Sequence, residues 1–317
     1  MKSPFQKIKT LLNLIHHGQF GLLAERWRFW KQSKRLAAAQ GPFVYVYDQD
    51  RMVCDPGVHD SRSIFLEKPT DPFERKLFRL WLHPGDWAVD AGANAGLFTA
   101  VAGEAVGPKG QVTALEPTPR LARLLKENSS LLGHSQTDVR EVALGGAPGR
   151  AKFAFAGEGE TAVSQSLATN NVPEGTAEIR EVEIVSLAGL AAEHPGKVPA
   201  LMKLDVEGAE KAALEGCPAD WKGKDGPLWV VECHPEALGR FQSSPKDLYR
   251  HFSDKDYELL VVGKFAGENS GDLAPEKLNR DQAPRASFWN LIALPRGQRW
   301  QRRREKLGRH GIGGRDR

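Results

Sequence analysis

Hydrophobic and polar positions alternate between two periods along the middle of the chain. Apolar runs of strand length, at 87–91 and 111–115, precede segments with helical spacing, at 95–105 and 119–132. This order predicts a mostly parallel sheet with helices on both faces. The other predicted strands are 138–143, 151–155, 180–185, 200–205, 228–232, 257–262 and 287–294, and the other predicted helices are 187–193, 208–214 and 235–253. The last two strands have no clear helix between them, so they could be antiparallel.

The segments outside this alternation have other patterns. Residues 5–36 predict one or two amphipathic helices, in which Trp and Phe alternate with Lys and Arg. Such a helix suits a membrane surface, but a helix packed on the main domain explains the spacing too, and we favour the latter. Residues 42–69 predict short strands and turns, and Asp71-Pro72 begins a helix that stops at His83-Pro84-Gly85. Residues 145–178, around the strand at 151–155, predict a loop over a site.

The charge is uneven along the 317 residues. The whole chain carries +4, but residues 1–36 and 295–317 each carry +7, which leaves −10 for residues 37–294. We therefore expect a basic N-terminal extension (1–69), a main domain (70–295) and a disordered basic tail (296–317). The basic ends could meet an anionic membrane or glycan, or could be simple solvated segments; nucleic acid is a less favoured partner.

Cysteines and apolar runs limit the class of protein. The three cysteines stand apart, without a CxxC pair, which argues against a disulfide framework and a structural zinc site. No run of about 20 apolar residues predicts a membrane span, and the N-terminus makes a poor signal peptide. We expect a cytoplasmic protein, with peripheral contact at the inner face of the membrane left open, and no metal.

The strongest chemical signal is the segment Val89-Asp90-Ala91-Gly92-Ala93-Asn94-Ala95-Gly96. It turns from a strand into a helix, with bare backbone at the carboxyl end of the strand. The dinucleotide fingerprint G-x-G-x-x-G lacks its second glycine here, and Asp90 would repel phosphate. The turn therefore favours a nucleoside without phosphates, whose cationic group the acid would suit.

Acids also end three later strands. Glu116, in Leu115-Glu116-Pro117, can accept hydrogen bonds from both ribose hydroxyls of a nucleoside. Asp205 and Glu207, in Lys203-Leu204-Asp205-Val206-Glu207-Gly208-Ala209-Glu210, end the strand at 200–205. Glu232 precedes Cys233-His234-Pro235, where His234 has the ordinary pKa range of a general base but could be only a turn residue.

These blocks together resemble the FkbM family of S-adenosylmethionine-dependent methyltransferases. The matching blocks, over roughly 70–262, are VDAGANAG at 89–96, LEP at 115–117, EVALG at 141–145, KLDVEGAE at 203–210 and VECH at 231–234. KLDVEGAE is the most specific of them. The chain departs from the family at Ser186-Leu187-Ala188, where the family often has an Asp.

The resemblance implies a fold and an activity. The fold is class I methyltransferase-like (Rossmann-like), with a mostly parallel seven-stranded sheet, helices on both faces and here an N-terminal helical extension. The activity is O-methylation of a sugar, a glycan or a related metabolite. The resemblance places Asp90, Gly92 and Glu116 at S-adenosylmethionine, and we add Asn94, Gly96 and Glu141 to the cofactor site.

The resemblance also places Asp205, Glu207 and His234 at the acceptor. We expect His234 to be the base and the two carboxylates to orient the acceptor. A metal-assisted version through Asp205, Glu207 and Glu232 is an alternative. Two other functions stay open: an NAD-dependent enzyme on a similar sheet, and a non-catalytic scaffold that docks through its basic ends.

Overall fold

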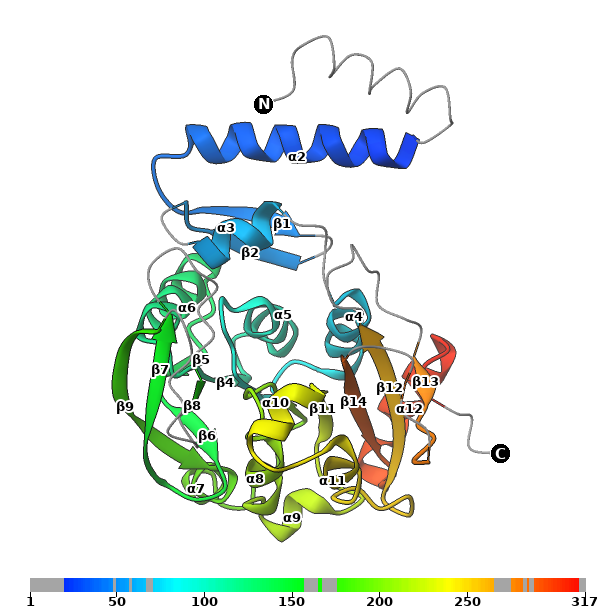
Figure 1. The fold of residues 1–317 in the computed structure, drawn as a ribbon. Helices are drawn as coiled ribbons and strands as arrows, with labels where there is room; N and C mark the ends of the chain where they lie inside the picture. Colours follow the sequence, from blue (N-terminus) through cyan, green and yellow to red (C-terminus); the bar gives the residue numbers. More distant parts are fainter. Residues whose placement is uncertain are drawn as a thin grey trace.

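The computed structural model describes residues 20–47, 50–56, 59–66, 71–156, 165–166, 176–264, 275–281, 284 and 288–313. Within them, the central sheet has the strand order β13-β12-β14-β11-β10-β3-β4-β5 (Figure 1). Its strands are β3 (Trp87–Ala91), β4 (Gln111–Leu115), β5 (Thr137–Arg140), β10 (Leu201–Leu204), β11 (Leu228–Cys233), β12 (Tyr257–Lys264), β13 (Glu276–Lys277) and β14 (Phe288–Pro295). The strands from β11 to β5 are parallel, and β14 is antiparallel to both β11 and β12. The predicted parallel sheet and its antiparallel final pair are confirmed, and β13 adds a short edge strand to the seven expected.

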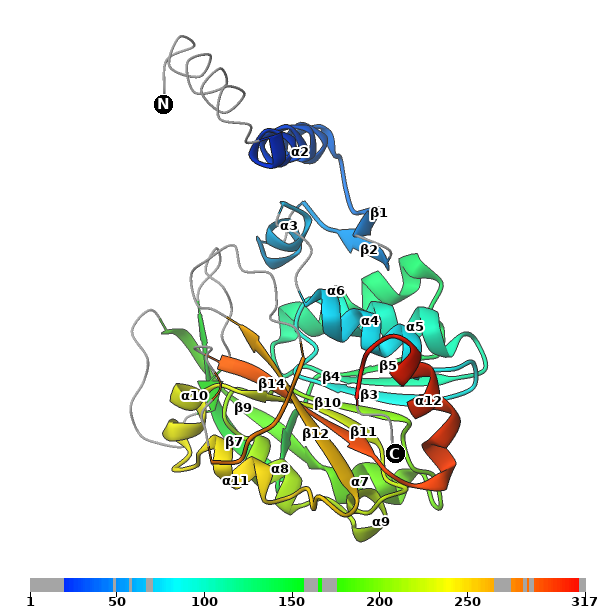
Figure 2. The ribbon, with the colours of Figure 1, turned by 90° about the vertical axis from the view of Figure 1, so that its right-hand side faces the viewer.

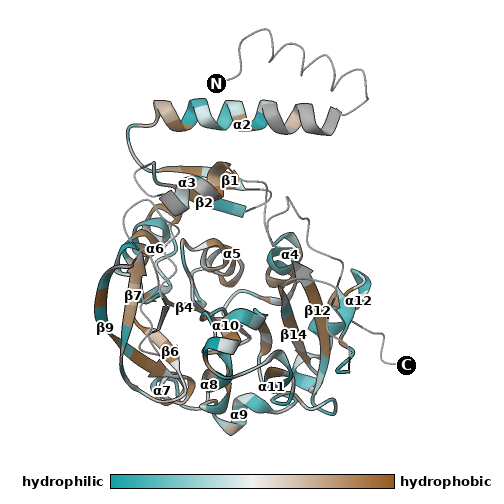
Figure 3. Cartoon of the chain, viewed as in Figure 1, coloured by the Kyte–Doolittle hydropathy of each residue, from teal (hydrophilic) through white to brown (hydrophobic). Residues whose placement is uncertain are grey.

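Helices cover both faces of this sheet (Figure 2). One face packs on α4 (Pro72–Trp81), α5 (Leu97–Val106), α6 (Pro119–Leu132) and α12 (Gln301–Arg309). The other face packs on α7 (Leu187–Glu193), α8 (Glu210–Glu215), α9 (Ala219–Lys222), α10 (Pro235–Arg240) and α11 (Pro245–Tyr249). Figure 3 shows the hydrophobic strands that this arrangement buries. Because helices cover both faces, the parallel strands read as continuous apolar runs.

A separate four-stranded sheet, in the order β6-β9-β7-β8, corrects part of the prediction. It consists of β6 (Ala143–Gly145), β7 (Gly149–Ala156), β8 (Gln165–Ser166) and β9 (Thr176–Ser186). The single strand predicted at 138–143 is wrong, because the chain leaves the central sheet after Arg140 and joins the second sheet at Ala143. In β9, buried Val182 lies between exposed Glu181 and Glu183, a pattern typical of a sheet with one solvated face. The rest of the predicted site loop, 157–164 and 167–175, lies outside the described residues.

The helical region predicted over 235–253 is helical but not one continuous helix. The chain forms α10 and α11 instead, separated by a turn in which Gln242 has φ 53°. Ser244 caps α11 in a reciprocal capping box with Asp247. Pro245 has no N–H and restricts the residue before it, so a continuous helix cannot pass this point.

An N-terminal unit lies beside α5 and α6. It consists of α2 (Phe20–Ala38), the hairpin β1 (Phe43–Tyr47) and β2 (Asp50–Cys54), and α3 (His59–Leu66), a helix that the pattern did not predict. Phe65 and Tyr45 form its small aromatic core, with ring centroids 4.7 Å apart. The buried Asp50 carboxylate binds the guanidinium groups of Arg75 and Arg79. This ion pair cluster joins the hairpin to α4.

The C-terminal tail is not disordered in its described part. A 3-10 helix, η1 (Gln298–Trp300), leads into α12, and Trp300, Leu307 and Ile312 are buried in the core that contains α4. Arg303 forms an ion pair with Asp86. The pattern missed this helix because its arginines outnumber its apolar side chains, which lie too far apart to show a period. Figure 3 shows α12 as largely hydrophilic.

The three cysteines are free and buried. Among the described helices, none combines the length and the hydropathy that a membrane span requires.

The Trp300 indole should make the C-terminal helix part of the cooperative fold. It is 2% exposed, its ring centroid lies 5.4 Å from that of Trp81, and its N–H donates a hydrogen bond of 2.6 Å to the Gly226 carbonyl. Trp300→Ala should lower the free energy of unfolding by about 3–5 kcal/mol, measured by urea denaturation. Arg302→Ala, at an exposed neighbouring position, should change it by less than about 0.5 kcal/mol. Equal stability of the two variants would contradict the packing described.

Candidate functional site

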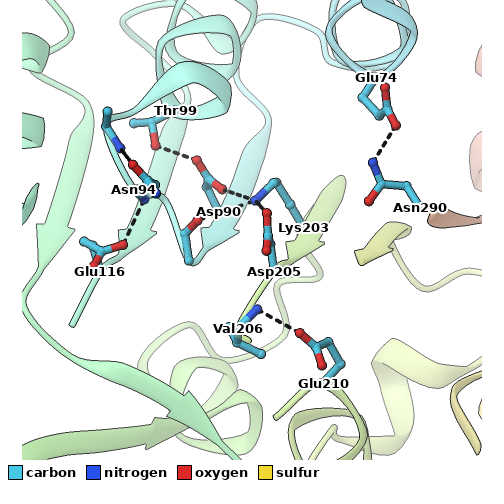
Figure 4. Close-up of polar contacts among 12 residues, drawn as sticks. Glu74, Asp90, Asn94, Thr99, Glu116, Lys203, Asp205, Val206, Glu210 and Asn290 are labelled. Carbon is cyan, nitrogen blue, oxygen red and sulfur yellow. Dashed lines mark hydrogen bonds and ion pairs between the residues drawn. The ribbon is translucent and has the colours of Figure 1, made fainter. Parts of the chain in front are cut away.

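Lys203 lies between two carboxylates at the carboxyl ends of β3 and β10 (Figure 4). Its Nζ is 3.0 Å from Asp205 Oδ2 and 3.6 Å from Asp90 Oδ1. Lys203 and Asp90 are register partners on adjacent parallel strands, so their side chains leave the same face of the sheet. Burial by itself lowers the pKa of the ammonium, but the charges of Asp205 and Asp90 outweigh it and the pKa is raised. Lys203 is therefore a charged group under all ordinary conditions.

Asp90 is enclosed by its neighbours. It is 2% exposed, and its Oδ2 accepts a hydrogen bond of 2.6 Å from the Thr99 hydroxyl of α5. The other oxygen faces Lys203. Asp90 therefore contributes its negative charge to the site, while its hydrogen bond to Thr99 and its ion pair with Lys203 connect β3 to α5 and β10.

Gly92 brings the turn after β3 into contact with the loop after β10. It has φ +75°, and a Cβ at this position would lie 1.6 Å from the carbonyl oxygen of Asp205. The amide of Asp205 in turn donates to the Ala91 carbonyl at 3.0 Å. Only glycine permits this close approach. The predicted cofactor turn and the predicted acceptor loop are therefore directly adjacent.

Glu116 supports the same turn from β4. Its two carboxylate oxygens accept hydrogen bonds from the amides of Asn94 (2.9 Å) and Thr118 (2.8 Å). Burial raises the pKa of Glu116 above its ordinary value, although these hydrogen bonds oppose the rise. Each oxygen keeps a second lone pair for a further donor. The carboxylate is thus preoriented beside the turn, and Asn94, with φ 49°, adopts the left-handed conformation that aims its amide at Glu116.

The other two predicted cofactor residues lie on the flanks of this turn. Gly96 caps α5 with φ 92° and packs against Leu125 of α6. Glu141 follows β5 and is exposed, and β5 neighbours β4 in the sheet. The Glu116 amide donates to the Arg140 carbonyl at 3.1 Å, which places Glu141 beside Glu116.

The loop 205–209 presents a second carboxylate. Glu207 has φ 56°, a conformation that a non-glycine residue adopts only when its surroundings impose it. Its carboxylate is 41% exposed and lies 3.4 Å from the Arg240 guanidinium of α10. Burial, and next the charge of Asp205, raise the pKa of Glu207 above its ordinary value. Glu207 is therefore a stronger base than an ordinary glutamate.

The buried Glu210 side chain binds the backbone of this loop. It is 2% exposed, and its Oε1 accepts hydrogen bonds from the amides of Val206 (2.9 Å) and Gly208 (3.3 Å). Its Oε2 is buried without a hydrogen bond. Burial raises the pKa of Glu210 to about 7. The backbone that carries Asp205 and Glu207 thus depends on a buried carboxyl.

His234 caps α10. Its Nδ1 accepts a hydrogen bond of 3.2 Å from the amide of Ala237. In a neutral ring the hydrogen is then on Nε2, and the lone pair of Nδ1 is occupied by the helix amide. Gly208 packs against the Ala237 carbonyl, where a Cβ would lie 2.3 Å away. His234 therefore fixes the helix that supports the loop.

The structure brings together most of the predicted site. Asp90, Gly92 and Asp205 meet around Lys203, and Glu207 adjoins Asp205. The pattern missed the roles of Thr99, Glu210 and Arg240. An acid in the first turn after Gly208 is a local signal that could have indicated Glu210 as a cap. Arg240 has no such signal, because only the packing of α10 places it.

The metal-assisted alternative can be compared with the same geometry. No group of three or more His, Cys, Asp or Glu side chains in the described residues, which include Asp205, Glu207 and Glu232, is arranged to hold a metal ion.

A protein-family model matches the chain. The model described as "Methyltransferase FkbM domain" matches residues 90–259, a little over half of the chain. The matched region begins at Asp90 and includes Glu116, Lys203, Glu210 and His234. No curated protein matched the chain.

Solved structures similar to the chain include methyltransferases. The methyltransferase FkbM from Methylobacillus flagellatus KT has 14% identity and a TM-score of 0.39, over 74% of this chain and 54% of that one. A putative rRNA methylase from Clostridium thermocellum has 9% identity and a TM-score of 0.41, over 71% and 94%. The S-adenosylmethionine-dependent O-methyltransferase from Thermotoga maritima has 15% identity and a TM-score of 0.35, over 70% and 64%. Likenesses of this size give no information on the acceptor of this chain.

Glu210→Gln should remove a pH dependence of stability. The folded-state pKa of about 7 lies above the unfolded value of 4.5, so between these values the native state binds more protons. The free energy of unfolding should then fall as the pH rises from about 4.5 to 7, by on the order of 3 kcal/mol. The amide of the variant can keep both loop hydrogen bonds without titrating.

The measurement is urea denaturation across this pH range, with Glu215→Gln as the control. Glu215 is on the same helix and is 57% exposed, so this variant should keep the wild-type slope. A Glu210→Gln variant with the wild-type slope would refute the assignment.

Proposed function

Because the chain belongs to the FkbM family of S-adenosylmethionine-dependent methyltransferases, we propose that it methylates a hydroxyl oxygen of a sugar, a glycan or a related metabolite. The observation that carries the proposal is the contact between Gly92 and the Asp205 carbonyl. This contact puts a cofactor turn beside a loop with two partly exposed carboxylates. Membership of this family excludes the NAD-dependent alternative. It also identifies the chain as an enzyme rather than a non-catalytic scaffold.

The residues of the first turn fit S-adenosylmethionine. Glu116 offers two oriented oxygens to the hydroxyls of a nucleoside, and Glu141 lies beside it. Asp90 and Asp205 outweigh the single charge of Lys203, so the site carries a net negative charge that suits a cation. When bound, S-adenosylmethionine supplies a methyl group on a positively charged sulfur.

The acceptor loop fits a polyhydroxyl compound. Asp205 is 35% exposed and Glu207 is 41% exposed, so both can accept hydrogen bonds from hydroxyl groups. Arg240, 38% exposed, provides donors next to them. Vicinal hydroxyls of a sugar match such a row of acceptors and donors.

A hydroxyl that becomes an ether must lose its proton, and we assign its removal to Glu207. The carboxylate is partly exposed and its pKa is raised, whereas the Nδ1 of His234 is occupied by the amide of Ala237. Asp205, held by Lys203 at 3.0 Å, orients the hydroxyl. In this proposal Glu207, and not His234 as the sequence led us to expect, is the base. His234 instead has a structural role as the cap of α10.

The acceptor class is tested with S-adenosylmethionine labelled in its methyl group. The purified protein is incubated with a cell-envelope glycan fraction, and the label is located after hydrolysis. We expect an O-methyl sugar, an ether that survives mild base. Label in RNA or protein, or label released by base as methanol from an ester, would contradict the proposal.

Glu207→Gln should show that Glu207 is the base, whereas His234 only caps α10. Loss of the base should lower kcat by about 10²-fold or more, with cofactor affinity unchanged, because Glu207 lies on the acceptor loop. In the wild type, activity should fall as the pH drops through the raised pKa of Glu207, since only the ionised carboxylate accepts a proton.

His234→Asn is the matched comparison, because Asn can still cap a helix. Its kcat should stay within about tenfold of the wild type, well above that of Glu207→Gln. The reverse order of the two variants would return the role of base to His234.

A further inference from the structure

Two tryptophans on α2 differ from the others in the chain. Trp27 and Trp30 are 62% and 54% exposed. The other six of the eight are at most 7% exposed: Trp81, Trp87, Trp221, Trp229, Trp289 and Trp300. Neighbouring indoles that are left in water on one helix mark a surface for another molecule.

α2 is attached to the protein by its other side. The Gln32 amide donates to the Phe65 carbonyl at 2.7 Å, and the Arg35 guanidinium donates to the Val44 carbonyl at 3.1 Å. Leu36 packs on the same aromatic core. These contacts hold the helix to β1 and α3, and Figures 1 and 2 show it at the outer end of the N-terminal unit.

Helical geometry puts the tryptophans on the side opposite Gln32 and Leu36, with Arg35 between the two sides. Positions 27, 30, 31 and 34 follow the i, i+3, i+4, i+7 spacing of one face, whereas 32 and 36 lie on the other. The exposed face therefore combines two indoles with Lys31 and Lys34. This face of α2 can therefore bind another molecule while the helix stays attached to β1 and α3.

The two lysines on this face lie over the indole rings. Lys31 Nζ is 5.2 Å from the centroid of the Trp27 ring, and Lys34 Nζ is 4.5 Å from that of Trp30. α2 as a whole has five basic residues and one acid, a net charge of +4. The face thus offers apolar rings together with ammonium groups.

We propose that this face of α2, Trp27, Trp30, Lys31 and Lys34, binds the surface of an anionic lipid bilayer, with the helix axis parallel to it. Indole rings favour the boundary between headgroups and acyl chains, because one edge is apolar and the N–H remains solvated. The lysines reach the lipid phosphates above them. A second copy of the chain is the less suitable occupant, because it would bring two helices of charge +4 together. The proposal does not depend on the identity of the acceptor.

Tryptophan fluorescence of the full chain tests this directly, because only Trp27 and Trp30 are open to quenchers. Mixed phosphatidylcholine–phosphatidylglycerol vesicles should shift the emission to the blue and protect it from acrylamide. Vesicles with brominated acyl chains should quench it. Pure phosphatidylcholine vesicles should have a much weaker effect, and high salt should reduce binding to the anionic ones.

Variants identify the face. In vesicle co-sedimentation, Trp27→Ala/Trp30→Ala should weaken binding by at least about tenfold, and Lys31→Gln/Lys34→Gln should remove the preference for anionic lipid. Phe29→Ala is the matched control: Phe29 is an aromatic residue, 53% exposed, that lies outside this face, and its loss should change binding by less than about twofold.

Two results would overturn the proposal. One is a wild-type protein that does not bind the anionic vesicles. The other is a tryptophan double variant that binds them as well as Phe29→Ala does. A self-association that the tryptophan substitutions abolish, without vesicle binding, would instead identify a second copy as the occupant.

Discussion

The charged cluster of Lys203, Asp90 and Asp205 fixes the position of the two loops that form the site. A buried ammonium is unfavourable unless carboxylates neutralise it, and removal of one partner from such a cluster typically costs about 3–5 kcal/mol. Lys203 also lies 5.1 Å from the Phe98 ring of α5, so the cluster joins two strands and a helix. Any shift of β10 against β3 would separate these charges. The register of the sheet and the position of the site are therefore set together.

Close backbone packing adds a second constraint to the electrostatic one. Gly92 and Gly208 each touch a carbonyl that a side chain would block, on Asp205 and on Ala237 respectively. The loop after β10 is consequently held between the turn after β3 and helix α10. The Glu210 carboxylate adds a third contact, because it accepts hydrogen bonds from two backbone amides of this loop. A loop held on three sides can keep Glu207 at a positive φ, and thereby keep its carboxylate at the edge of the site.

The two basic ends have different structural roles, although their compositions are alike. Arg303 and Arg304 of the C-terminal helix form ion pairs with Asp86 and Glu258, so part of its charge is neutralised by the main domain. On α2, by contrast, the described lysines stack on exposed indoles. Similar compositions thus give ion pairs with the main domain at one end and, in the described part of the other, a helix face that exposes indoles and lysines.

The sequence by itself determined the alternation of strands and helices, the acids at the strand ends and the glycine turn. These are local features, since burial on both faces imposes apolar runs and a tight turn demands glycine. Only the tertiary structure decided the rest. The chain enters a second sheet after Arg140, the arginine-rich tail folds around Trp300, and His234 becomes a helix cap. The first two depend on partners far away in the chain: β9 for β6, and Trp81 for Trp300. The cap of His234 is local, through Ala237, but the packing of α10 against Gly208 is long-range. Periodicity within a segment reports its own burial, but it carries no information about which distant group will satisfy a charge or a hydrogen bond.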